Sequence, residues 1–196
     1  MSSSEAKIDV GTKLQLGPER PERKRRPRLK QFAYMGRHAY HVVLTVKERA
    51  AVFEDVKFGA WCVGQLAEAE KAAGFEVLAY CFMPDHVHFL ARGREDASSL
   101  IKFVQNFKQR TAYHFKQASG DQLWQQSYFD RVIRADDDLE DVAAYIFQNP
   151  VAEGLTADAA SYALSGGVYF DGASRTELKL RPYVASHSSR MDHDDD

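Results

Sequence analysis

The sequence predicts an α+β fold, in which a largely antiparallel sheet is covered by helices. Three observations support this: alternating apolar residues at 40–46, two short apolar runs at 75–83 and 86–93 joined by a tight turn, and helical periodicity around them. Hydrophobic residues make up 44% of the 196 residues and charged residues 28%, which is typical of a globular chain. At roughly 150 residues per domain, we expect one domain with tails.

The first half of the chain contains three predicted strands and one helix. Alternation over 40–46 predicts a strand, and good helix formers from Val52 to Ala73 predict a helix that stops at Gly74. FEVLAYCFM (75–83) and HVHFLARG (86–93) form a predicted hairpin turning at Pro84–Asp85. The expected buried face of the helix is Val52, Val56, Gly59, Ala60, Val63, Leu66 and Ala67.

The second half begins with a basic amphipathic helix that Ser98 or Ser99 can cap. Between Leu100 and Ala118 it carries no acid. Its expected buried face is Leu100, Phe103, Val104, Phe107 and Ala112. The stretch LWQQSYFDRVIR (123–134) is aromatic and β-like, and the helical pattern after it should end before Pro150.

The element order β, α, β, β, α, β, α resembles a ferredoxin-like split β-α-β sheet with helices on one side and an added C-terminal helix. The hairpin would supply central strands. We expect a flexible basic leader at 1–30, a domain at 31–157, and an extension at 158–196 with an acidic, disordered end.

Charge and cysteine content restrict the class of protein. The leader has nine Lys and Arg against four acids, a net charge of +5, and could engage phosphates or simply be solvated. Apolar runs are too short to span a bilayer, so we expect no membrane partner, and we expect no secretory signal. Cys62 and Cys81 form no disulfide framework, which favours a reducing cytoplasm.

Two histidines on the second hairpin strand are candidate metal ligands. His86 and His88 are two residues apart, so both side chains should project from one sheet face. Two imidazoles can bind one divalent metal, although half-exposed strand histidines are the plainer interpretation. Asp85 could orient an imidazole or merely form the turn.

A tyrosine and an asparagine on the last helix are the other candidates. Tyr145 is a poor nucleophile at its normal pKa of about 10, but a metal that polarises the electrophile makes it useful. Asn149 lies one turn later on the same face and could offer its carbonyl oxygen to that metal. Alternatively, Tyr145 packs on the sheet and Asn149 is a helix cap.

Taken in order, these motifs resemble the single-tyrosine HUH transposases, and among them the REP-associated tyrosine transposases. HUH means His–hydrophobic–His, matched by His86–Val87–His88, and the nucleophile string is matched by Tyr145, Ile146, Asn149 and Pro150. The aromatic and basic stretch from Trp124 to Arg134 is also similar. The resemblance covers residues 32–155.

The resemblance implies an HUH endonuclease-like fold and a DNA strand transferase of the cytoplasm, associated with the nucleoid. His86, His88 and Asn149 would hold Mg²⁺ or Mn²⁺, although some relatives carry Gln in place of Asn149. Tyr145 would form a 5′-phosphotyrosine link with single-stranded or hairpin DNA at a repeated palindrome. Basic residues expected to bind DNA are Lys102, Lys108, Arg110, Lys116, Arg131 and Arg134.

Three other functions stay open from the sequence. A metal hydrolase would use activated water and leave Tyr145 idle. A non-catalytic or domesticated hairpin-binding regulator would bind DNA without cleaving it. A structural α+β domain would do neither. The chain could act as a monomer, or as a homodimer in which one subunit's tyrosine serves the other's histidines.

Overall fold

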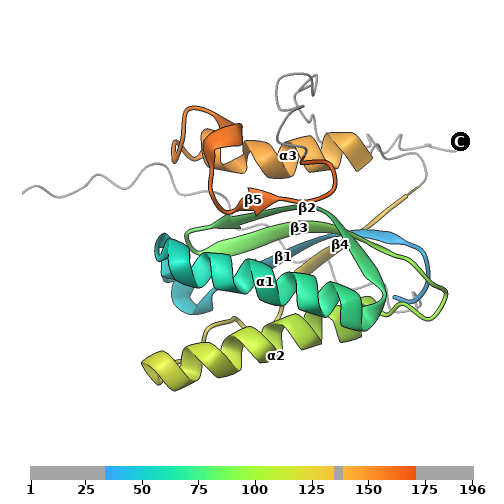
Figure 1. Cartoon of the computed structure of the whole chain (residues 1–196), viewed down its shortest axis with the longest axis horizontal. Coiled ribbons are helices and arrows are strands. Elements are labelled where there is room, and N and C mark those ends of the chain that lie inside the picture. The colour runs from blue at the N-terminus through green and yellow to red at the C-terminus, as the bar shows by residue number, and fades with distance from the viewer. Residues whose placement is uncertain (1–33, 135–138, 171–196) are drawn as a thin grey trace, which may run out of the picture.

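The structure is a computed structural model that describes residues 34–134 and 139–170 (Figure 1). The leader at 1–30 and the acidic end lie outside the described residues. The strands are β1 (Ala39–Thr45), β2 (Phe75–Met83), β3 (His86–Gly93), β4 (Phe129–Ile133) and β5 (Ser165–Gly166). The helices are α1 (Val56–Ala73), α2 (Leu100–Ser119) and α3 (Leu139–Ala152), with 3-10 turns at Lys47–Arg49, Val52–Glu54 and Ala159–Ser161.

The five strands form one antiparallel sheet in the order β4-β1-β3-β2-β5. The first four strands of this order reproduce the expected split β-α-β arrangement, so the predicted fold class is confirmed. The hairpin strand β3 lies between β1 and β2, with backbone hydrogen bonds on both sides. A strand held on both sides gives its side chains fixed directions.

Helices cover both faces of the sheet (Figure 1). Helices α1 and α2 pack on one face, where β3 contributes Val87, Phe89 and Ala91 to the larger core. Helix α3 packs on the opposite face against a smaller core that includes Leu90 and Ile146. Because successive strand residues alternate faces, the histidines of β3 point toward α3 and away from α1 and α2.

Strand β2 contains an irregularity that changes which residues face α1. Its register with β3 shifts between Val77 and Ala79. Phe75 and Val77 belong to the core under α1 and α2, as does Phe82, five residues after Val77. Strict alternation would place Val77 and Phe82 on opposite faces of the sheet. The extra residue at the register shift reverses the alternation, so both side chains face α1 and α2.

Helix α1 begins later than the sequence indicates. Asp55 caps it by accepting hydrogen bonds from the backbone N–H groups of Lys57 and Phe58, and Val52–Glu54 forms a separate 3-10 turn. The residue at which the helix begins determines which side chains face the sheet. The expected buried face is therefore partly wrong, and Val56 is 53% exposed. The buried residues are Gly59, Cys62, Leu66 and Ala69.

Helix α3 runs through Pro150 and ends at Ala152, whereas the sequence pattern indicated an end before the proline. Pro150 has no N–H to donate to the carbonyl of Ile146. The side-chain amide of Asn149 donates to that carbonyl at 3.2 Å, and to the Tyr145 carbonyl at 2.9 Å. The asparagine thereby substitutes for the missing backbone donor.

The fold continues past residue 157, the domain end expected from the sequence. Strand β5 pairs with β2, Leu164 is buried in the larger core, and the Tyr162 hydroxyl donates to the Phe82 carbonyl at 2.9 Å. Among the helices within residues 34–134 and 139–170, none has the length and apolar character needed to cross a membrane.

Candidate active site

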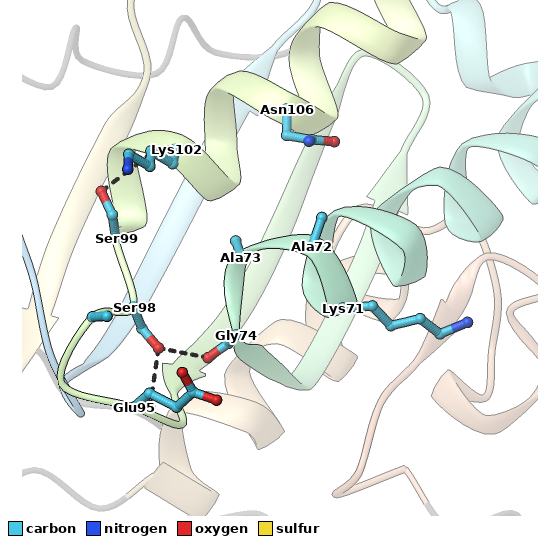
Figure 2. A pocket seen from close by; sticks show the side chains of 10 residues that line it. Lys71, Ala72, Ala73, Gly74, Glu95, Ser98, Ser99, Lys102 and Asn106 are labelled. Carbon is cyan, nitrogen blue, oxygen red and sulfur yellow. Dashed lines mark hydrogen bonds between the residues drawn. The ribbon is translucent and has the colours of Figure 1, made fainter.

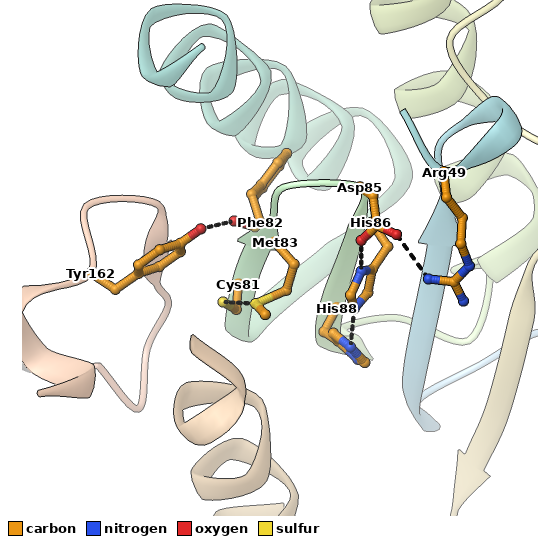
Figure 3. A network of polar contacts seen from close by, with 8 residues as sticks. All are labelled: Arg49, Cys81, Phe82, Met83, Asp85, His86, His88 and Tyr162. Atoms are coloured by element: carbon orange, nitrogen blue, oxygen red, sulfur yellow. Dashed lines mark hydrogen bonds and ion pairs between the residues drawn. The ribbon is translucent and has the colours of Figure 1, made fainter. Parts of the chain in front are cut away.

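The paired histidines lie side by side at the start of β3. His86 pairs with Thr45 of β1 and Met83 of β2, and His88 pairs with Val43 and Cys81. The Nε2 atoms of the two imidazoles are 3.0 Å apart (Figure 3). His88 is 6% exposed, whereas His86 is half-buried. The strand geometry therefore presents two ring nitrogens at one point on the α3 face.

Asp85 anchors one of these rings from the turn of the hairpin. Its Oδ1 lies 2.5 Å from His86 Nδ1, and its Oδ2 accepts a hydrogen bond from Arg49 at 2.8 Å (Figure 3). Burial raises the pKa of this carboxyl, but the hydrogen bonds from His86 and Arg49 outweigh burial and lower the pKa to about 2. At neutral pH, Asp85 is therefore an acceptor that fixes the orientation of the His86 ring.

Tyr145 reaches the histidines from α3 of the same chain. Its ring centroid is 6.0 Å from that of His88 and 6.0 Å from that of His41, with edge-to-face geometry in both cases. The tyrosine is half-buried and packs against the smaller core. The structure thus places a phenol beside His88 and His41 within one chain.

His41 is a site residue that the sequence motifs did not indicate. It lies on β1, and its Nε2 is 3.1 Å from His88 Nδ1. The two rings stack with centroids 5.4 Å apart. The weak signal was alternation: because Tyr40, Val42 and Leu44 are core residues of the α1 and α2 face, His41 must face α3.

The predicted basic residues divide between the two sheet faces. Helix α2, with Lys102, Lys108, Arg110 and Lys116, covers the face opposite the histidines. Lys108 donates to the carbonyls of Gln125 and Gln126, and Arg110 donates to Gln65. Their DNA contacts stay a prediction, and DNA at the histidines would have to extend around the sheet edge to meet them.

Arg131, in contrast, lies at the histidine site. It is the direct cross-strand partner of His41 in the pairing of β1 and β4, so both side chains leave the sheet on the α3 face. Phe129, two residues before it, is 42% exposed and contacts the His41 ring edge-on. Arg134 follows the end of β4 and is exposed. This strand supplies a cation and an aromatic ring beside the imidazoles.

The geometry of the two Nε2 atoms fits a small divalent cation. Ligands at right angles in an octahedral shell with bonds of 2.0–2.1 Å are about 2.8–3.0 Å apart. Tetrahedral zinc would place two nitrogens about 3.3 Å apart. The observed 3.0 Å therefore suits adjacent positions of an octahedral shell, and it also suits a hydrogen bond between the rings.

The described residues do not form a complete protein cage for such a cation. Within 34–134 and 139–170, no cluster of three or more His, Cys, Asp or Glu residues could hold a metal. His41 faces Nδ1 of His88, on the other side of that ring, and so does not point at the shared Nε2 position. The amide nitrogen of Asn149 is committed to α3, which leaves its carbonyl oxygen as the candidate ligand atom.

A hollow of about 470 Å³ lies elsewhere, where the end of α1 meets the start of α2 (Figure 2). Its walls include Lys71, Gly74, Glu95 and Lys102. Ser98 also lines the hollow, and its hydroxyl donates a hydrogen bond to the Gly74 carbonyl at 2.6 Å. Both helices lie on the sheet face opposite the histidines, so this hollow is separate from the candidate active site.

Comparison with known proteins gives a family and two relatives. A family model described as "Transposase IS200 like" matches residues 34–149. A Haemophilus influenzae protein described as a REP-associated tyrosine transposase is 29% identical over 91 residues, covering 41% of this chain and 52% of that protein. The chain thus spans about half the length of this curated relative. A solved structure of a REP-associated tyrosine transposase bound to a REP hairpin has a TM-score of 0.62 at 18% identity, covering 79% of this chain and 92% of that one. This last likeness concerns the fold.

Proposed function

Since the chain belongs to the IS200-like transposase family, we propose that it cleaves and rejoins single-stranded or hairpin DNA through Tyr145. The resemblance to tyrosine transposases seen in the sequence motifs is confirmed by the family match and by the relatives. The single observation that carries the proposed chemistry is the placement of the Tyr145 ring 6.0 Å from the ring of His88.

In the proposed reaction, the Tyr145 hydroxyl oxygen attacks a backbone phosphorus atom. The bond from phosphorus to the 3′ oxygen breaks, and the phenol proton is lost while the leaving 3′ oxygen gains one. The products are a 5′-phosphotyrosine link and a free 3′-hydroxyl. Because the link retains a phosphodiester, a 3′-hydroxyl can later attack it and rejoin strands without another energy source.

His86 and His88 are the residues that would hold Mg²⁺ or Mn²⁺, together with the Asn149 carbonyl oxygen. The separation of 3.0 Å between the imidazole Nε2 atoms supports the two histidines as adjacent ligands. When bound, the cation would neutralise charge that develops on the phosphate. Asp85 keeps the His86 ring in place, and Arg131 supplies a cation on the same sheet face.

Hairpin DNA is the proposed substrate because one structurally similar transposase is bound to a REP hairpin. The exposed ring of Phe129 offers a stacking surface next to Arg131, which suits an unpaired base beside its phosphate. We expect replacement of Arg131 by Ala to weaken hairpin binding and to reduce the salt dependence of binding by about one phosphate contact.

The test is incubation of the protein with short labelled hairpins and Mn²⁺, followed by a denaturing gel. We expect a covalent protein–DNA adduct that the Tyr145→Phe variant lacks. Tyr113→Phe is the matched control, because Tyr113 is 70% exposed on α2, on the other sheet face. Cleavage that persists undiminished in Tyr145→Phe would indicate a hydrolase that uses water. Hairpin binding that ignores EDTA, without cleavage under any metal, would indicate a regulator.

A further inference from the structure

A continuous line of hydrogen-bonding groups runs through the candidate site and includes His41. It passes from the Asp85 carboxylate to His86 Nδ1, from His86 Nε2 to His88 Nε2, and from His88 Nδ1 to His41 Nε2. The three spacings are 2.5, 3.0 and 3.1 Å. His41 is 9% exposed and His88 is 6% exposed, so the contact between these two rings is made away from bulk water.

Each neutral imidazole has one N–H and one bare nitrogen. The proton position on one histidine of the line therefore determines the proton positions on the next. Asp85 is ionised and accepts the proton of His86 Nδ1, which leaves His86 Nε2 bare. Without a cation, the contact between the two Nε2 atoms then requires His88 Nε2 to donate. His88 Nδ1 is bare in this state and accepts from His41 Nε2.

A metal-binding state requires the opposite arrangement at His88. Its Nε2 must be bare to face a cation, so its proton must reside on Nδ1, and the group that meets Nδ1 is His41. We propose that His41 is a positioning residue, which accepts the His88 Nδ1 proton and so holds His88 in the form that binds a metal. His41 would serve His88 as Asp85 serves His86.

This inference rests on the proposed metal site and adds a residue outside the His–hydrophobic–His motif. It also gives strand β1, which carries His41, a role in the proposed site. His41 contacts the Tyr145 ring as well as the His88 ring, so one side chain touches both the nucleophile and a proposed metal ligand. Its position depends on the pairing of β1 with β3, which places His41 opposite Leu90 and beside His88.

The test compares two variants of the full chain, His41→Gln and His41→Phe. Glutamine can place an acceptor near the position of imidazole Nε2, whereas phenylalanine keeps the ring shape and removes the acceptor. Mn²⁺ affinity is measured by electron paramagnetic resonance of the free ion, without DNA. We expect His41→Phe to weaken Mn²⁺ binding about 10–100-fold, and His41→Gln to stay near wild type. His114→Phe, a histidine stacked on Trp61 outside the site, should change nothing.

Nitrogen NMR of the imidazoles gives a second measurement. In the metal-free protein we expect the His88 proton on Nε2, and with saturating Mg²⁺ on Nδ1. The inference is overturned if His41→Phe binds Mn²⁺ as wild type does, or if both His41 variants lose affinity equally while remaining folded. A wild-type chain that binds no Mn²⁺ would instead refute the metal in the proposed function. In that case, a His88 Nδ1 resonance that is unchanged in metal-free His41→Phe, which lacks the hydrogen bond from His41, would separately refute the contact between His41 and His88.

Discussion

Replacing Asp85 by Asn should destabilise the protein in a way that depends on pH. Asp85 connects the hairpin turn to two other groups: Arg49 at 2.8 Å and the His86 ring. Asparagine keeps nearly the same shape and leaves intact the backbone hydrogen bond from Val46 N–H to the Asp85 carbonyl. The substitution therefore removes the negative charge that faces Arg49 and His86, and it keeps the backbone of the turn.

The expected size follows from the pKa of Asp85, which falls from an ordinary 3.8 to about 2 in the folded protein. A pKa lowered to this extent corresponds to about 2 kcal/mol of stability at neutral pH. Because the Arg49 side chain is 68% exposed, solvent screening reduces this, and we expect about 1–2 kcal/mol. A depressed carboxylate pKa stabilises the fold above the unfolded-state pKa, so the contribution is full above about pH 5 and roughly half lost by pH 3.

The assay is urea unfolding of wild type and Asp85→Asn in EDTA at several values between pH 3 and 7. The free energy of unfolding should differ most at pH 7 and converge toward low pH. Asp96→Asn is the control, because it removes an ion pair with Arg37 whose two side chains are 69% and 95% exposed. That change should cost less than about 0.5 kcal/mol. A difference for Asp85→Asn that stays constant between pH 3 and 7 would refute the reasoning.

Two further predictions concern α1 and the assembly of the site. Both Gly59→Ala and Gly64→Ala gain about 0.5–1 kcal/mol of helix propensity. A Cβ at Gly59 would lie 2.5 Å from Leu164 Cδ1, whereas one at Gly64 meets nothing within 4 Å. In thermal unfolding, Gly64→Ala should therefore stabilise the protein, and Gly59→Ala should destabilise it by about 1–2 kcal/mol through overpacking. Equal shifts of the melting temperature in the two variants would contradict this packing. Mixing a His88→Ala chain with a Tyr145→Phe chain should restore no covalent DNA adduct, because one chain supplies both rings; restored adduct would show exchange between subunits.

The sequence predicts the hairpin and the shared face of its two histidines well, because the signals are local. Pro84 and Asp85 interrupt an apolar run of 75–93, and such a break specifies a turn between adjacent strands. The spacing of His86 and His88 then requires a shared face. In contrast, the role of His41 depends on which strand pairs with β3 and in what register. No local pattern contains that information.

Other differences also arise from long-range or compensating contacts. Amphipathicity indicates that α2 buries one side, but it does not say that this side meets the sheet face opposite the histidines. A proline normally ends a helix, yet Pro150 lies inside α3 because the Asn149 amide reaches the carbonyl that the proline leaves unpaired. Leu164 lies in a stretch without clear periodicity, and its burial against Gly59 is seen from the fold.

The irregularity in β2 isolates the two ends of that strand from each other. At one end, Met83 and Cys81 pair with His86 and His88, and the turn before β3 sets this register. At the other end, Phe75 fills the core under α1. Because the turn at Pro84–Asp85 sets the register beside the imidazoles, we expect a one-residue insertion at Gly74 to leave the pairing of Met83 with His86 unchanged.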